Sequence, residues 1–395
     1  MAAPRRISGT GLLACFLAMW LLGTWAAPAA AKWRFVVMGD SRGSGTGINE
    51  EILSELVHEV LRRDIDLVIF PGDLVYGGWT EPAQFEAQLW NWIGVMRPLY
   101  DAGVPVYVCR GNHEIGDMWY PEMFETPDPT DNFGQRWLHV FGSPKHPQLR
   151  LPDNGPRGEK YMSYSVVHKN AMIVALDQYA GEQYYPAHYV NQPWLDAQLR
   201  SNVQPHVFVF AHEPAFRTLR YDCLDAHPYR RDAFWNSLKT AGARTYFCCH
   251  DHYYDHARVD DGDGDPDNDI HQLIAATAGA PLYDWAPPYD GNNGDFTVEQ
   301  VYHAAQWGYL LVTVDDLTVT ITWMERQDDS PLSPVLYLAK HVWRYDVPPK
   351  KSPCPTKLAA DLNGDCRVDF ADLAILAAEW LAPDNPPNPP PNSHE

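Results

Sequence analysis

The sequence predicts a layered α/β domain followed by a small helical module near the C-terminus. From residue 33 to about residue 242, short apolar runs alternate with amphipathic helical segments, a pattern typical of layered α/β folds. The apolar runs end in carboxylate, amide or imidazole side chains. Folds that build their sites beyond the C-terminal ends of strands place such residues in this way. Beyond residue 270 the pattern is of strands alone, which suggests a second sheet packed on the first.

The expected elements follow one another along the chain. The helix predicted at residues 49–63 carries Ile52, Leu56 and Val60 on one face. Further helices are expected at residues 82–96, 193–201 and 231–241. The expected early strands are WRFVVMGD, LVIFPGD, VPVYVCRGNHE, AMIVALD, HVFVFAHEP and RTYFCCHDH, and the later ones are HQLIAATAG, YLLVTVDD, TVTITWME and HVWRYDV. Between them lies a loop-rich insertion, residues 115–160, whose aromatic residues Trp119, Tyr120 and Trp137 either form an ordered rim or lid or pack on the surface.

The N-terminus is typical of an export signal. Arg5 and Arg6 precede an apolar run, and APAAA gives a small-residue cleavage site near Ala31. We therefore expect an exported protein, periplasmic, cell-surface or secreted, although a retained membrane anchor is the alternative. Six cysteines remain after cleavage, of which Cys354 and Cys366 are the first pair to test for a disulfide.

Changes in composition and proline-rich segments divide the chain into five parts. We expect a signal peptide at 1–31, the main domain at 32–347, a Pro/Lys linker at 348–356, a calcium module at 357–382 and a disordered Pro-rich tail at 383–395. The formal net charge of −21 argues against a nucleic-acid partner, whose phosphates would be repelled. The sequence does not indicate an oligomeric state.

The strand-end residues indicate a metal site. They fall in five fragments, GDSRG, GDLVY, GNHE, AHEP and CHDH. Oxygen and imidazole donors of this kind suit Fe, Mn or Zn better than Ca²⁺. The candidate ligands are Asp40, Asp73, Tyr76, Asn112, His212, His250 and His252.

In order and in content, these fragments resemble the motifs of the calcineurin-like metallophosphoesterase superfamily, over about residues 33–347. The resemblance implies a four-layer α/β/β/α sandwich, two mixed sheets flanked by helices, with two transition metals. It implies that Asp73 bridges the metals and that Asp40 and His252 bind the first. The remaining residues would bind the second: Asn112, His212 and His250.

The resemblance also implies an activity, hydrolysis of a phosphomonoester or phosphodiester. Two cations would clamp the phosphate and lower the pKa of a bridging water, which then attacks phosphorus as hydroxide. His113 would be the general acid for the leaving oxygen, with Glu114 beside it as a charge partner. The alternative is a non-catalytic exported protein that binds a metal or another ligand on the same scaffold.

Two residues depart from the family pattern. Cys249 stands in CHDH where Gly is usual, a change that we expect to be tolerated. Arg42 stands where the first motif usually has His, and a guanidinium offers no lone pair to a metal. In the purple acid phosphatase branch, a Tyr at the spacing of Tyr76 ligates iron, so Tyr76 either replaces the missing ligand or packs under the site. Arg42 would then either clamp the substrate phosphate or pair with a nearby carboxylate.

Two acidic segments are candidate calcium-binding sites. DDGDGDPDND, residues 260–269, is either a calcium loop or a solvated turn, and its Pro266 rules out an EF-hand. DLNGDCRVDFAD resembles half of a type I dockerin repeat, with ligands expected at Asp361, Asn363, Asp365, the carbonyl of Arg367, Asp369 and Asp372. The resemblance implies bound Ca²⁺ and leaves open a cohesin-like or cell-surface partner.

Overall fold

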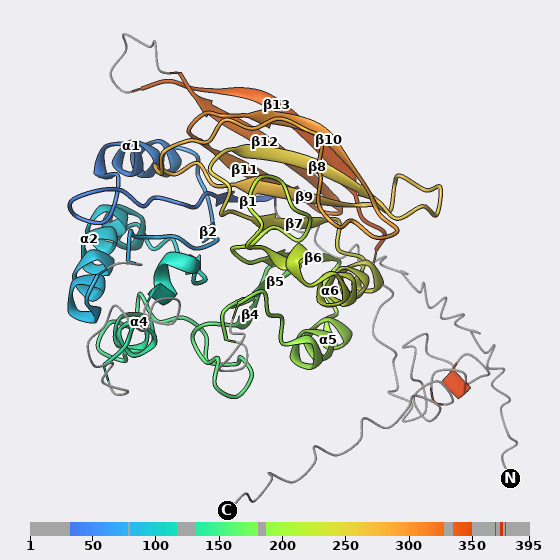
Figure 1. Cartoon of the computed structure of the whole chain (residues 1–395), viewed down its shortest axis with the longest axis horizontal. Helices are drawn as coiled ribbons and strands as arrows, with labels where there is room; N and C mark the ends of the chain where they lie inside the picture. Colours follow the sequence, from blue (N-terminus) through green and yellow to red (C-terminus); the bar gives the residue numbers. More distant parts are fainter. Residues whose placement is uncertain are drawn as a thin grey trace, which may run out of the picture.

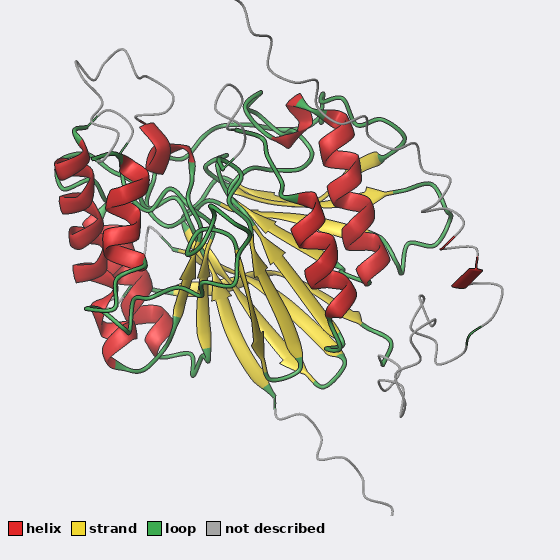
Figure 2. Ribbon diagram, turned by 90° about the horizontal axis from the view of Figure 1, so that it is seen from below, coloured by secondary structure: helices red, strands yellow, loops and turns green. Residues whose placement is uncertain are grey.

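Two β-sheets lie face to face at the centre of the molecule, with helices on both outer sides (Figures 1 and 2). This computed structural model describes residues 32–77, 80–116, 131–180, 187–327 and 335–349, and the single positions 368, 372, 373 and 376. The first sheet has the strand order β13-β12-β11-β1-β2-β3, and the second has the order β10-β8-β9-β7-β6-β5-β4. The expected arrangement, two mixed sheets flanked by helices, is therefore confirmed.

The first sheet combines the two ends of the described chain. Strands β1 (Trp33–Val37), β2 (Leu67–Phe70) and β3 (Val106–Val108) run parallel to one another. Strands β11 (Gly308–Asp315), β12 (Thr318–Arg326) and β13 (Tyr337–Asp346) are added antiparallel beside β1.

The second sheet holds the middle of the chain. Its parallel part consists of β5 (Ala171–Ala175), β6 (His206–Phe210), β7 (Thr245–Cys248) and β9 (Ile270–Ala275). Antiparallel strands complete it: β4 (Tyr164–His168), β8 (Tyr254–Asp260) and β10 (Thr297–Ala304).

Four helices bury a face against a sheet, and a fifth packs on one of these helices. On the first sheet pack α1 (Glu50–Leu61) and α2 (Pro82–Asp101), and on the second pack α5 (Gln192–Ser201) and α6 (Pro228–Ala241) (Figure 1). Helix α4 (Phe133–Phe141) packs on α2, where the ring of Phe133 stacks on that of Phe85 at 4.3 Å. Helix α1 begins where the side chain of Asn49 accepts a hydrogen bond from the N–H of Ile52, which satisfies a backbone donor that the helix cannot. Two short 3₁₀ helices, η1 (Asn112–Ile115) and η3 (Leu224–Ala226), lie in loops.

Aromatic side chains fill the space between the sheets. Phe35 of β1 lies with its ring centroid 5.0 Å from Phe208 of β6 and 6.0 Å from Phe247 of β7. Tyr254 of β8 stacks on Trp323 of β12 at 4.5 Å. All five side chains are fully buried, so these contacts fix one sheet against the other.

The assignment of late strands to a sheet of their own was wrong. Strand β11 pairs with β1, so the last three strands extend the first sheet, whereas β9 joins the second sheet beside β7. Apolar alternation marks a strand but not its partner, and β1 is buried in mid-sheet with a neighbour on each side. Strands β4, β8 and β10 and helix α4 were not expected.

The described part of the insertion is more regular than predicted. It contains α4, and Trp137 of that helix is fully buried and donates a hydrogen bond from its indole nitrogen to the carbonyl of Tyr161, 2.9 Å away. Trp137 is therefore a core residue. Trp119 and Tyr120 lie outside the described residues.

Several predictions fall outside the described residues: the signal peptide, the Cys354–Cys366 pair, most of the linker, the Pro-rich tail and most of the calcium module. Of the calcium ligands expected in that module only Asp372 is described, as a buried residue in a helical turn. The four cysteines of the described part, at 109, 223, 248 and 249, are free thiols. None of the described helices has the length and apolar character needed to cross a bilayer.

Candidate metal centre

Five loops meet at one edge of the sandwich, each following the C-terminal end of a parallel strand. They follow β1, β2 and β3 in the first sheet and β6 and β7 in the second. Three of the predicted ligands have left-handed backbones, with φ of 57° at Asp40, 49° at Asp73 and 78° at His250. Such a backbone is uncommon for a residue with a side chain and clusters at functional sites.

Four predicted ligands converge on one point. Nε2 of His212 lies 3.4 Å from Oδ1 of Asp73, 3.1 Å from Oδ1 of Asn112 and 3.1 Å from Nδ1 of His250. Nδ1 of His250 is also 3.0 Å from Oδ1 of Asn112. A cluster of oxygen and imidazole donors at such separations suits a transition metal.

Partners on the far side of each imidazole orient the rings. Nδ1 of His212 donates to the carbonyl of Pro71 at 2.9 Å, which leaves the lone pair of Nε2 facing the cluster. Nε2 of His250 lies 3.4 Å from Oδ1 of Asp222. Burial opposes the protonated form of His250, but Asp222 outweighs it and raises the pKa of His250 to about 9. Metal-ligating histidines commonly have such outer partners.

Asp40 and His252 lie beside this cluster. Oδ1 of Asp40 is 3.3 Å from Nε2 of His252, and Oδ2 accepts the backbone N–H of His250 at 3.1 Å. Oδ1 of Asp40 is buried and has no hydrogen-bond partner among the described residues. Atoms of Asp40, Asp73 and His212 lie within 4.8 Å of one another, close enough to share a metal ion.

Arg42 enters the centre between these groups. Its Nη2 lies 3.3 Å from Nε2 of His252 and 3.3 Å from the hydroxyl of Tyr283, and its Nε lies 3.6 Å from Oδ2 of Asp73. The pairing with a carboxylate, one of the two roles considered for Arg42, is thus present. The ring of Tyr283 stacks on His252 with centroids 4.1 Å apart.

His113 and Tyr76 lie at the open side of the centre. The backbone N–H of His113 donates to Oδ1 of Asp73 at 3.1 Å, and Nε2 of its ring is 3.9 Å from Oδ2 of the same carboxylate. Nδ1 of His113 bonds the carbonyl of Tyr76, and burial lowers the pKa of His113. The side chain of Tyr76 is 36% exposed, and its hydroxyl has no hydrogen-bond partner among the described residues.

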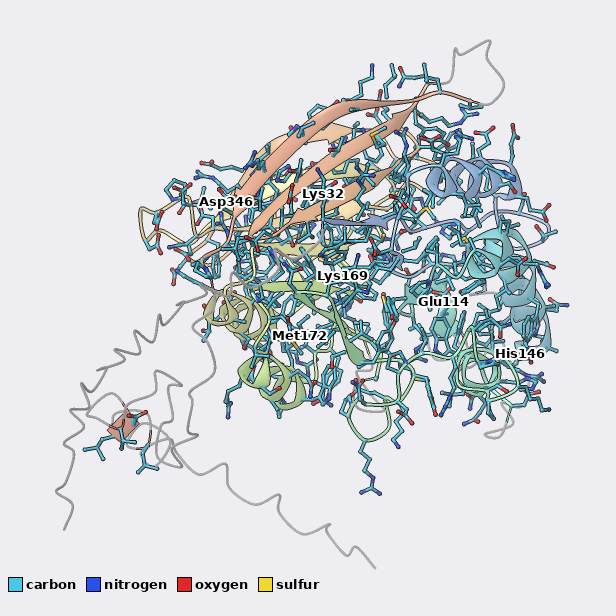
Figure 3. All side chains as sticks on the ribbon, turned by 180° about the vertical axis from the view of Figure 1, so that it is seen from behind. Lys32, Glu114, His146, Lys169, Met172 and Asp346 are labelled. Carbon is cyan, nitrogen blue, oxygen red and sulfur yellow. The ribbon has the colours of Figure 1, made fainter. Side chains whose placement is uncertain are left out.

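Glu114 has partners other than the predicted one. Its carboxylate accepts the backbone N–H groups of Gly111 at 2.7 Å, Asp73 at 3.0 Å and Val75 at 3.2 Å (Glu114 is labelled in Figure 3). Burial, and then the neighbouring Asp73, raise the pKa of Glu114. The carboxylate of Glu114 therefore connects the loop that follows β2 with the loop that follows β3. Among the described residues it forms no hydrogen bond with His113. The two adjacent side chains of η1 have different partners, since the ring of His113 bonds the carbonyl of Tyr76.

Glycines make the close approaches possible. A Cβ at Gly111 would lie 2.2 Å from Oδ1 of Asp73. A Cβ at Gly39 would lie 2.4 Å from Sγ of Cys249, so Gly39 provides the space that Cys249 takes up. The departure from the family pattern at Cys249 is thus accommodated within the fold.

The acidic segment at residues 260–269 lies away from this centre, beyond β8. Carboxylate atoms of Asp260, Asp261 and Asp269 come within 4.8 Å of one another. Lys239 pairs with Asp261 and, at 3.1 Å, with Asp263. The neighbouring ammonium already offsets part of the acidic charge, and calcium binding there stays a prediction.

Two residues that contact the centre had not been predicted. Asp222 and Tyr283 come from irregular loops, where no periodic pattern marks a side chain that points inward. Pro281 contributes only a carbonyl, which accepts from Nδ1 of His252 at 2.7 Å. Sequence offers no signal for such backbone groups.

Comparisons with known proteins agree on one family. A family model described as calcineurin-like phosphoesterase matches residues 34–254. The chain is 26% identical over 202 residues to purple acid phosphatase 21 of Arabidopsis thaliana, a match that covers 50% of this chain and 40% of that relative.

Solved structures share the fold. The purple acid phosphatase PPD1 of yellow lupin has a TM-score of 0.57 and 15% identity, over 80% of this chain and 54% of its own. A structure of PhoD has a TM-score of 0.57 and 12% identity, over 80% of this chain and 71% of its own. The chain thus spans about half the length of the plant proteins that it matches.

Proposed function

The chain belongs to the calcineurin-like phosphoesterase family, and on that premise we propose that it hydrolyses a phosphomonoester or phosphodiester with the help of a bound transition metal. The observation that carries this proposal is the cluster in which donor atoms of Asp73, Asn112 and His250 each lie 3.1–3.4 Å from Nε2 of His212, beside the imidazole of His113. The family match and the similarity to a purple acid phosphatase support the same chemistry.

The metal would be Fe, Mn or Zn, held by Asp73, Asn112, His212 and His250. When bound, it supplies a Lewis acid that polarises the phosphoryl group. In its protonated form, His113 would donate the proton on Nε2 to the leaving oxygen. Its Nδ1 bonds the carbonyl of Tyr76, which fixes the orientation of the ring. A water oxygen forms the new bond to phosphorus and loses a proton to solvent, the ester P–O bond breaks, and the departing oxygen takes the proton from His113.

The direct test is turnover of p-nitrophenyl phosphate and of its bis-ester by protein loaded with Mn²⁺, Zn²⁺ or Fe. We expect hydrolysis of at least one ester, and its loss in His212→Ala. A folded protein with normal metal content and no turnover of either ester would overturn the proposal. That result would favour a non-catalytic binding protein on the same scaffold.

We further propose that the protein is exported through residues 1–31 and that residues 357–382 bind Ca²⁺ and serve as an attachment module. The basic start, the apolar run and the small-residue site support the first proposal, and the acidic 1-3-5 spacing supports the second. A chain lacking residues 357–395 should lose calcium binding and surface attachment and keep its turnover. Loss of turnover in that chain would argue against a separate attachment module.

A further inference from the structure

We propose that the guanidinium of Arg42 takes the place of one of the two metals implied by the motifs, so that the centre holds a single transition metal. This inference rests on the proposed function, because it concerns the same site. It starts from the atoms that would have to bind the first metal, which belong to Asp40, Asp73 and His252.

Both ring nitrogens of His252 have hydrogen-bond partners. Its Nδ1 donates to the carbonyl of Pro281 at 2.7 Å, so the lone pair of the ring lies on Nε2. That lone pair is the one a metal would need, and Nη2 of Arg42 lies 3.3 Å from it. A guanidinium can only donate, so the contact is a hydrogen bond from Arg42 to His252.

The carboxylate of Asp73 is divided between two cation positions. Oδ1 faces the four-donor cluster, 3.4 Å from His212, whereas Oδ2 lies 3.6 Å from Nε of Arg42. A bridging carboxylate would present its two oxygens to two metals. Here the second oxygen faces a fixed positive charge.

Arg42 is held in this position from several directions. Its Nη2 also donates to the hydroxyl of Tyr283 at 3.3 Å, and Tyr283 is itself stacked on His252. The backbone of Arg42 forms a β-bridge with Ile48, and its side chain is only 17% exposed. Contacts of the backbone and of the side chain therefore both hold the guanidinium of Arg42 in the centre.

The charges favour one metal over two. A divalent ion bound by Asp40 and His252 would lie beside a guanidinium that keeps its charge at any ordinary pH, and the two cations would repel each other. A metal in the cluster around His212 would meet less repulsion. There Asp73 presents Oδ1 to the cluster, whereas Arg42 lies beside Oδ2, the other oxygen of the same carboxylate. Arg42 thus supplies the positive charge that a first metal would otherwise bring to the phosphate.

Metal content tests the inference without reference to activity. The full chain is stripped with a chelator, reloaded separately with Mn²⁺ and Zn²⁺, freed of excess ion, and measured by elemental analysis. We expect about one transition ion per chain for the wild type. Arg42→His should raise the content to about two, because the new imidazole joins Asp40 and His252 and the repelling charge is gone.

Arg42→Gln serves as a second variant, since it removes the charge without adding a strong ligand. After the same reloading and removal of excess ion, we expect its content to lie between one and two ions. Arg326→His is the matched control, because Arg326 also pairs with a carboxylate, Glu55 at 2.7 Å, and is about as buried as Arg42, but lies on β12, outside the loops that carry the donors. Its content should stay at one.

The outcomes separate this inference from the proposed function. Two ions in the wild type with normal turnover would overturn the inference alone, and so would folded Arg42→His and Arg42→Gln proteins that both remain at one. One ion without turnover would overturn the proposed function and leave the inference intact. A folded wild type that retains no ion would overturn both.

Discussion

Asp222 lies with Oδ1 3.4 Å from Nε2 of His250, on the side of the ring opposite the donor cluster, and it also accepts two hydrogen bonds from Arg220. The carboxylate thereby fixes the ring so that Nδ1 faces Asn112 and His212. It is an outer partner of the proposed metal, contributed by a loop that carries no motif.

Asp222→Asn should therefore weaken metal binding by about 10–100-fold, because an amide orients and polarises the imidazole less well. Competition with a chromogenic chelator would measure the change. Asp290→Asn is the matched control, since Asp290 also lies 3.4 Å from its cationic partner, Arg217, but on the surface. Equal affinities for wild type and Asp222→Asn would contradict this role.

Glu114→Gln should reduce both stability and turnover. The carboxylate accepts three backbone N–H groups, and an amide would leave at least one of those donors without a partner. An unsatisfied buried donor costs about 1–3 kcal/mol of unfolding free energy, which denaturant titration would measure. Glu81→Gln is the control, because Glu81 is exposed and makes no side-chain hydrogen bond at the start of α2. Wild-type stability in Glu114→Gln would show that the carboxylate is dispensable.

The sequence predicts most of the donors because parallel strands gather their C-terminal ends. Asp40, Asp73, His212 and His250 each follow an apolar run, and these runs form parallel strands within the two sheets. The periodic pattern is therefore enough to bring these four side chains to one edge of the sandwich.

What the sequence did not predict depends on contacts between distant segments. Pairing of β11 with β1 joins residues more than 270 positions apart, such as Val37 and Leu310, and nothing in either apolar run identifies the other. Asp222 and Tyr283 reach the centre from irregular loops. Glu114 was given a role by its position beside His113, whereas the turn of η1 sends its side chain to the backbone of another loop.

Stability should fall in acid because of three histidines between the sheets. Nδ1 of His256 lies 2.9 Å from Nε2 of His341, and Nε2 of His256 lies 2.7 Å from Nδ1 of His271. Burial and then Arg244 and Arg258 lower the pKa of His271 to about 3. Burial, followed by the other two imidazoles, lowers the pKa of His256.

In the unfolded chain a histidine has a pKa near 6.5, so below that pH the unfolded state binds more protons than the folded state. The stability supplied by the neutral cluster is complete above pH 6.5 and is lost as pH falls toward 3. His271 contributes about 1.4 kcal/mol per pH unit in that window.

His271→Asn should make the loss of stability between pH 6 and pH 5 smaller by about that amount, as measured by urea titration at each pH. Trp343→Phe is the control, because Trp343 stacks on His271 with centroids 3.9 Å apart and does not titrate. It should lower stability equally at both pH values. An unchanged pH dependence in His271→Asn would refute the assignment.

His113→Ala should lower turnover by about 10²–10⁴-fold for an alkyl phosphate and by much less for p-nitrophenyl phosphate. A poor leaving oxygen needs the proton from Nε2, whereas nitrophenolate leaves without one. Metal content should stay unchanged, since the described donors of the cluster do not include this ring. His139→Ala removes a histidine of α4 that pairs with Glu86 and serves as the control. An equal loss for both substrates would exclude His113 as the general acid.

The role of Tyr76 follows from the position of Arg42. If the guanidinium fills the first metal position, Tyr76 has no iron to bind, in agreement with its exposed side chain and unpartnered hydroxyl among the described residues. Iron-loaded protein should then lack the purple charge-transfer band of an iron-bound tyrosinate, and Tyr76→Phe should retain the metal content of the wild type. Absorption spectra of both proteins, with Tyr221→Phe as an exposed control, would decide the matter. A visible band that disappears only in Tyr76→Phe would instead make Tyr76 a ligand and require a second metal beside Arg42.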